Sequence, residues 1–211
     1  MAKLRWGALG VAVASVVLVA TPASAARVVS KFNGKGGTAI VTDCGTSPAV
    51  GTKCIAFVVA ASQFRVKENG TVTKFPSLSL EKYRVTIVNG GFETTFVFGG
   101  FTDVVKLQVA DNLSSATASG TVPIEQCDQH GCKVTNFPVS FDLHANAPAD
   151  FNKGRVVQKF GNCKIIDRFN FRSRTADGSA TVRGKTYPTS PAVPSSIDLS
   201  REKVVFKNCD A

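Results

Sequence analysis

The chain has 211 residues, six cysteines, 44% hydrophobic residues and a formal net charge of +10. This composition can bury a core, and it excludes a disordered or a collagen-like chain. There are two histidines and one tryptophan, and the tryptophan is the sixth residue, so few residues are available for an active site.

The first 25 residues have the pattern of a secretory signal peptide. Lys3 and Arg5 precede an apolar run over Gly7–Ala20, and Ala23-Ser24-Ala25 supplies the small residues that a signal peptidase recognises. The alternative is a membrane anchor, but the run is shorter than the ~20 residues of a spanning helix. We therefore expect cleavage near Ala25 and a mature chain over 26–211. This chain is expected to be secreted or associated with the cell envelope, without a transmembrane segment.

An even number of cysteines in an exported chain predicts three disulfides. The six are Cys44, Cys54, Cys127, Cys132, Cys163 and Cys209. Distance along the chain favours two local bridges, Cys44–Cys54 and Cys127–Cys132, which leaves Cys163–Cys209. Cys127, His130 and Cys132 also offer ligands that zinc accepts. Because an oxidising compartment favours a disulfide at a hairpin tip, we expect no metal there.

The rest of the chain has the pattern of β-strands. Short runs of Val, Ile, Phe and Thr alternate with Gly, Asn and Asp, and no ten-residue stretch has helical spacing. The turn signals predict an antiparallel all-β sandwich or barrel of about a dozen strands. We expect strands over 55–64, 71–75, 82–88, 92–98, 101–110, 115–126, 132–144, 155–161, 164–174, 179–187 and 197–206.

Glycine and asparagine place the predicted turns. Asn69-Gly70 is typical of a tight hairpin turn, and Gly99-Gly100 predicts another turn between two strands. A polar loop is expected over Asn146–Gly154. Ser115–Val122 and Ser179–Thr186 have similar sequences. This similarity leaves open either two related halves, over 26–122 and 123–211, or a coincidence among strands rich in Thr and Ser.

Several of these features occur together in a family. The early cysteine pair, the strand over 113–122, the Cys127–Cys132 hairpin and the later Phe160-Gly161-Asn162-Cys163 segment resemble secreted proteins of unassigned function in actinobacteria and their relatives. The resemblance covers most of the mature chain. It implies an exported all-β fold, and it supplies no catalytic residues to carry over.

Two patterns leave other functions open. Asp142 and His144 alternate along a strand, so both point to one face, and a serine would complete a hydrolase triad. No Gly-x-Ser-x-Gly motif accompanies them, and the enzyme interpretation is the less favoured one. A secreted inhibitor is a further alternative, with the proline-rich segment over Pro188–Ser196 as its binding loop. No P-loop or dinucleotide motif is present, and no cofactor is expected.

The positive charge is concentrated in one stretch. Residues 153–185 contain nine basic and two acidic residues, whereas residues 26–152 contain 11 and 10. Alternation along a strand places Arg168, Arg172 and Arg174 on one face and Phe169 and Phe171 on the other.

A two-residue turn at Asp177-Gly178 would place Arg172 opposite Arg183. Like charges in this position destabilise a sheet, so the pattern predicts a face that binds an anionic partner. The candidate residues are Arg168, Arg172, Arg174, Arg183 and Lys185. The expected partner is a cell-wall phosphate polymer, an acidic polysaccharide or an acidic protein, and nucleic acid is the least expected. The alternative is a solvated edge whose charges prevent aggregation.

Overall fold

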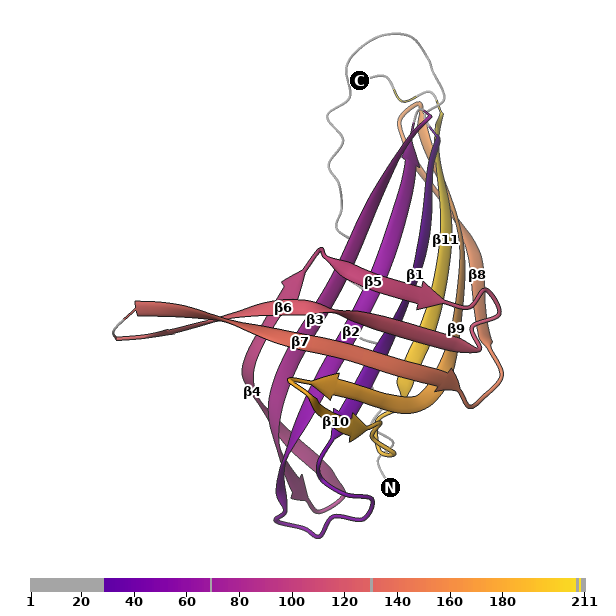
Figure 1. Cartoon of the computed structure of the whole chain (residues 1–211). Coiled ribbons are helices and arrows are strands. Elements are labelled where there is room, and N and C mark those ends of the chain that lie inside the picture. Colours follow the sequence, from indigo (N-terminus) through magenta and orange to yellow (C-terminus); the bar gives the residue numbers. More distant parts are fainter. Residues whose placement is uncertain (1–28, 69, 130, 208, 210–211) are drawn as a thin grey trace.

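The computed structural model describes residues 29–68, 70–129, 131–207 and 209 (Figure 1). It confirms the all-β prediction. The described residues form eleven strands: β1 Val29–Thr42, β2 Lys53–Glu68, β3 Thr71–Val88, β4 Gly91–Thr102, β5 Val105–Val109, β6 Ser115–Asp128, β7 Gly131–Ala145, β8 Asp150–Phe160, β9 Cys163–Val182, β10 Lys185–Pro188 and β11 Ser195–Lys207. The predicted signal peptide lies outside the described residues. Among the described residues, no helix has the length and apolarity that crossing a membrane requires.

The strands form one antiparallel sheet in the order β4-β3-β2-β1-β11-β9-β7-β6-β5, and β8 and β10 pair with β9. β9 joins two layers, because its first part pairs with β8 and β11 and its last part pairs with β7. The sheet thereby folds over itself, and β5, β6 and β7 cross in front of the long strands (Figure 1). We call β1, β2, β3, β8, β9 and β11 the long strands. They continue well beyond β5, and we call this part their distal half.

The core lies between the crossing strands and the covered part of the long strands. Its fully buried side chains include Val41, Val59, Leu78, Leu80, Leu113, Val122, Ile124, Leu143 and Ile197. At Gly37 on β1 the layers come close, since a Cβ there would lie 3.2 Å from the Phe141 ring and 3.3 Å from the Ala116 methyl group. The two layers therefore meet through small residues as well as large ones.

The predicted turn at Gly99-Gly100 is wrong, because both glycines lie inside β4. A Cβ on Gly100 would overlap the carbonyl oxygen of Pro123 and lie 2.8 Å from Cδ1 of Ile124 on β6. Glycine is needed here because another backbone approaches closely. In a sequence, a glycine required for this reason looks the same as a glycine required by a turn.

The predicted turn at Asp177-Gly178 is also wrong. Gly178 lies inside β9 opposite Leu143 of β7, and the chain turns instead at Arg183-Gly184, where both residues have positive φ, 52° and 80°. The predicted pairing of Arg172 with Arg183 therefore does not occur. Arg172 lies opposite Leu199 and Phe151.

Several strands extend beyond their predicted limits. The sequence pattern missed β1, which contains three glycines, and β8 begins inside the predicted loop over Asn146–Gly154. The proposed boundary between two halves falls within β6. The Arg183-Gly184 turn divides the second of the two similar segments, so that segment is not a single strand equivalent to the first.

The structure contains three disulfides, and they join the pairs that the spacing favours. The Cα atoms are 5.0 Å apart in Cys44–Cys54, 4.0 Å in Cys127–Cys132 and 4.1 Å in Cys163–Cys209. The first two close short loops, and the third ties the start of β9 to the segment after β11. No described cysteine is free.

Candidate anion-binding face

The side-chain pattern of the long strands changes halfway along each strand. On one side of β2 the residues change from buried and apolar to exposed and basic, in the series Phe57, Val59, Ala61, Gln63, Arg65 and Lys67. The crossing strands explain this change, because they cover only part of this side and leave the distal half open to solvent. The other side shows no such change, because its residues are half-buried along the whole strand, with Phe64 and Val66 in the distal half.

The strand register places five cations directly opposite one another on the open side. In the order β8-β9-β11-β1-β2 they are Arg155, Arg168, Lys203, Lys31 and Lys67. Neighbouring strands are about 4.8 Å apart, and directly opposed residues share a face. Four of the five residues are exposed, and Lys203 is half-buried. This row runs across five strands of the distal half, from β8 to β2, and Val72 of β3 lies opposite Lys67 at its end.

Two further rows lie between this row and the crossing strands. The second row consists of Lys153, Asn170, Arg201, Asn33, Arg65 and Lys74. The third contains Arg172, Lys35 and Gln63 among apolar residues. No Asp or Glu occupies any position in the three rows. We call these cations the basic face: Lys31, Lys35, Arg65, Lys67, Lys74, Lys153, Arg155, Arg168, Arg172, Arg201 and Lys203.

The cations of the basic face have no carboxylate partner. Among the described residues, the one ion pair joins His144 to Asp142, far along β7. The Arg172 guanidinium instead lies over the Phe151 ring, 4.8 Å from its centroid. Its Nε is buried and has no hydrogen-bond partner among the described residues. The mutual repulsion of the basic face is therefore not balanced by neighbouring acids.

The nearest acids in the strand register lie on the reverse side of the sheet. Asp167 and Glu202 occupy adjacent strands, on the side of Phe169. Burial raises the pKa of Asp167, and a hydrogen bond with Glu202 partly offsets this effect. Burial also raises the pKa of Glu202, as does the charge of Asp167. These carboxyl groups are therefore separated from the basic face by the sheet itself.

Aromatic rings cover much of the reverse side. A Cβ on Gly34 would lie 2.8 Å from the Phe64 ring, and a Cβ on Gly154 would overlap the Phe169 ring. Each ring therefore lies over a glycine of the neighbouring strand. Phe171, on the same side, is 38% exposed. Over the three rows, the distal half thus has cations on one side and aromatic rings on the other, as the predicted alternation of Arg and Phe implies.

The five predicted binding residues do not form one cluster. Arg168 and Arg172 belong to the basic face. Arg174 is on the same side of β9, but its guanidinium donates to the carbonyl oxygens of Ala147, at 2.8 Å, and Asn112, at 3.3 Å. Arg183 and Lys185 lie at the β9–β10 turn and line a separate cavity.

Most cations of the basic face were missed by the sequence analysis. Their signal was present as alternation, in Lys31-x-Asn33-x-Lys35, Arg65-x-Lys67, Lys153-x-Arg155 and Arg201-x-Lys203. Each pattern is short and is ordinary for an exposed strand. Only the register of six strands shows that they form continuous rows.

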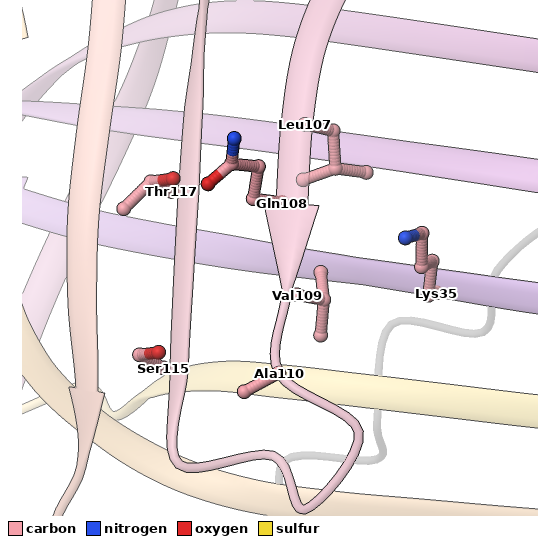
Figure 2. A pocket seen from close by; sticks show the side chains of 7 residues that line it. All are labelled: Lys35, Leu107, Gln108, Val109, Ala110, Ser115 and Thr117. Carbon is pink, nitrogen blue, oxygen red and sulfur yellow. The ribbon is translucent and has the colours of Figure 1, made fainter.

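A cavity of about 440 Å³ lies where the basic face meets the crossing strands. Lys35 of β1 lines it together with Leu107, Val109 and Thr117 from β5 and β6 (Figure 2). In the figure, the Lys35 side chain lies on the side of β5 toward which Leu107 and Val109 extend. The cavity therefore extends the third row toward β5.

The other sequence candidates are placed apart from the basic face. His144 Nε2 lies 3.3 Å from Asp142 Oδ1, as their alternation predicts, but the side chains are 69% and 60% exposed. Within the described chain, no hydroxyl group is hydrogen-bonded to His144. Cys127 and Cys132 are joined in a disulfide, so their thiols are unavailable to a metal, and His130 lies outside the described residues.

The proline-rich loop is tied to the sheet. The Ser190 amide donates to the Ile40 carbonyl at 2.7 Å, and Thr189 forms a β-bridge with Val41. The Ser195 hydroxyl at its end accepts from the Ile40 amide at 2.9 Å. Both ends of the segment are thus hydrogen-bonded to β1, and its use as a binding loop stays a prediction.

Comparisons with known proteins show only distant similarity. No family model matches the chain, and no curated protein matches it. Among solved structures, an acetoacetate decarboxylase-like enzyme from Sphingomonas wittichii RW1 aligns at 7% identity with a TM-score of 0.32, over 93% of this chain and 98% of that one. The enduracididine biosynthesis enzyme MppR, complexed with the condensation product of pyruvate and imidazole 4-carboxaldehyde, aligns at 8% identity with a TM-score of 0.31, over 88% of each chain. At these scores the likeness carries no functional argument.

Proposed function

We propose that this protein is exported and that it binds an anionic polymer of the cell envelope through the basic face. The observation that carries the proposal is the row of five opposed cations from β8 to β2, without an acid in it. Three disulfides and the signal-like first 25 residues support an oxidising compartment.

The repulsion within the row favours a ligand. Each directly opposed pair of like charges destabilises the folded sheet, and four such pairs follow one another from Arg155 to Lys67. A bound polyanion would remove this repulsion and release counterions from its own charges. Binding would therefore be strongest at low salt and would stabilise the fold.

The dimensions of the face favour an extended ligand over a single small ion. Five strands at about 4.8 Å spacing give a row roughly 20 Å long, and successive rows on one side of a sheet are about 7 Å apart. A chain with an anionic group in every repeat can contact several cations at once along this row. A single phosphate or carboxylate can contact only two or three of them.

Neutral polar residues in the rows indicate what else the ligand carries. Asn33 and Asn170 lie in the second row between cations, and Gln63 lies in the third. Amide side chains hydrogen-bond to hydroxyl groups as well as to anions. The three rows contain one aromatic ring, that of Phe151, and Arg172 already covers it. This composition favours a polyol phosphate or an acidic polysaccharide, and it disfavours single-stranded nucleic acid, whose binding relies on stacking.

A pull-down with matched charge variants tests the proposal. The variant Lys31→Gln/Arg168→Gln/Lys203→Gln removes three charges from the first row. The control Lys53→Gln/Lys106→Gln/Lys133→Gln removes three exposed charges outside the rows. We expect wild type and control to bind beads carrying poly(glycerol phosphate) and to pass through neutral dextran beads, and the row variant to lose at least tenfold in retention. Equal retention of the two triple variants would show that only net charge matters and would overturn the proposal.

A further inference from the structure

A second cavity, of about 410 Å³, lies between the two layers at the end of the molecule opposite the distal half. We call it the aromatic cavity. Its lining residues come from β2, β3, β4, β6, β7, β10 and the end of β9 with the turn after it: they are Phe57, Lys82, Phe98, Gln126, Phe137, Val182, Arg183, Lys185 and Tyr187. No Asp or Glu is among them, and none of them belongs to the basic face.

Two pairs of aromatic rings form its walls. Phe57 of β2 contacts Tyr187 of β10 with ring centroids 5.2 Å apart, and Phe98 of β4 contacts Phe137 of β7 at 5.1 Å. Each pair joins a ring from β2 or β4 to a ring from the covering layer. The rings therefore hold the walls together, and they supply the apolar part of a lining that also contains Gln126 and three cations.

Three cations lie against these rings. Lys82 Nζ lies 5.5 Å from the Phe98 centroid and 5.9 Å from that of Phe57. The Arg183 guanidinium lies 5.0 Å from the Phe137 centroid, and Lys185 Nζ lies 4.9 Å from that of Tyr187. Contacts of this kind hold a cation in place without neutralising it. Each cation therefore keeps its charge available to a ligand in the cavity.

The backbone at Arg183 indicates a function for its side chain. Arg183 has φ of 52°, and Leu113 is the one other described non-glycine residue with positive φ. A two-residue turn of this kind favours Asn, Asp or Gly at its first position, and a long side chain there is strained. Such strain at an arginine that lines a cavity is typical of a residue kept for binding rather than for folding.

We propose that the aromatic cavity is a binding site for a small organic anion. The carboxylate or phosphate of the ligand is held by Lys82, Arg183 and Lys185, and its apolar or aromatic body lies against the Phe98 and Phe137 rings. The volume lies in the range of pockets for small ligands. This site is independent of the polymer-binding function, since it shares no residue with the basic face, and where the two use the same strands, β2, β3 and β9, they use different parts of them.

Titration of the folded protein with benzoate, followed by isothermal calorimetry and by NMR chemical shifts, tests this site. The variants are Arg183→Asn, which suits the turn, and Lys82→Met, which keeps an unbranched side chain. The control is Arg155→Gln, which removes one charge from the basic face. We expect benzoate to shift the signals of Phe98, Phe137 and Tyr187, and both cavity variants to bind at least tenfold more weakly. Benzyl alcohol, the neutral analogue, should also bind at least tenfold more weakly than benzoate.

The variant Arg183→Asn separates a loss of binding from a loss of folding. Arg183→Asn should unfold at the same temperature as the wild type or a higher one, because the strained arginine is removed, so a loss of binding cannot come from unfolding. Unchanged benzoate binding in Arg183→Asn would overturn the proposal. Shifts confined to residues of the basic face, together with weaker binding in Arg155→Gln alone, would assign the anion to that face and would also overturn it.

Discussion

Lys31 on β1 lies directly opposite Lys203 on β11 in the antiparallel ladder, and no described carboxylate is paired with either side chain. On their other sides, Lys31 lies opposite Lys67 and Lys203 lies opposite Arg168. A sheet selected for stability alone would alternate charges at these positions. The arrangement is therefore the feature of the distal half that most needs a functional explanation.

Reversing one charge in the row should stabilise the fold. Lys203→Glu places a carboxylate between Lys31 and Arg168, so two repulsive contacts become attractive. We expect the free energy of unfolding to rise by about 0.5–1 kcal/mol, measured by urea denaturation at low salt. The control Lys53→Glu, exposed and outside the rows, should change it by less than about 0.5 kcal/mol. A Lys203→Glu variant less stable than wild type would contradict the repulsion described for this row.

A methyl group at Gly100 should disturb the contact between β4 and β6. Its Cβ would overlap the Pro123 carbonyl oxygen and approach Ile124, so the strands must move apart. We expect Gly100→Ala to lower the free energy of unfolding by about 1–3 kcal/mol. Gly91→Ala on the same strand is the matched control, since a Cβ there meets nothing within 4 Å. Equal effects of the two changes would show that the layers are not in close contact at Gly100.

The carboxyl pair on the reverse side should make stability depend on pH. The pKa of Asp167 and that of Glu202 are both raised in the folded state from their ordinary values of 3.8 and 4.5. Groups with raised carboxyl pKa stabilise the fold below the unfolded pKa, and this stabilisation is lost as pH rises through the folded pKa. We expect Asp167→Asn to gain stability over wild type as the pH rises above 3.8, the ordinary pKa of the Asp167 carboxyl, measured by thermal unfolding. Asp150→Asn, which changes an exposed acid on β8, should give no such gain. If the difference in stability between Asp167→Asn and wild type did not change with pH, the pKa of Asp167 would not be raised in the folded state.

The three disulfides should contribute unequally. Cys163–Cys209 spans 46 residues, whereas Cys127–Cys132 spans five. Loop-closure entropy assigns about 4 kcal/mol to the longer loop and about 2 kcal/mol to the shorter one. We expect Cys163→Ser/Cys209→Ser to lower the free energy of unfolding about twice as much as Cys127→Ser/Cys132→Ser does. Urea unfolding of both variants, with the remaining bridges verified by peptide mapping, gives the comparison.

The sequence predicted the class of the fold because strand alternation is a local property. The Asn69-Gly70 hairpin and the alternation of Arg168 and Arg172 with Phe169 and Phe171 were visible in a few adjacent residues. The errors arose at glycines that other backbone approaches closely, from β6 at Gly100 and from the paired strand β7 at Gly178. Gly100 and Gly178 lie inside strands because other backbone passes close by, and a single sequence cannot distinguish this use from a turn.

The candidate site was predicted only in part because it depends on register. Arg168 and Arg172 were identified on β9, but their partners Arg155, Lys203 and Lys31 are far away in the sequence. No local pattern states which residue of β1 will lie opposite which residue of β11. The excess charge of 153–185 is visible in the sequence, and the fold brings cations from β1, β2, β3 and β11 beside it.

The most direct test of polymer binding is the salt dependence of the association constant. We would titrate poly(glycerol phosphate) into the wild type, into Lys31→Gln/Lys203→Gln and into the control Lys53→Gln/Lys106→Gln over a range of NaCl concentrations. Each phosphate contact contributes about 0.7–0.9 to the slope of log K against log salt. We expect a steep slope for wild type and control, and a slope lower by about 1.5 for the row variant. The same slope in all three proteins, or no binding by the wild type at low salt, would contradict it.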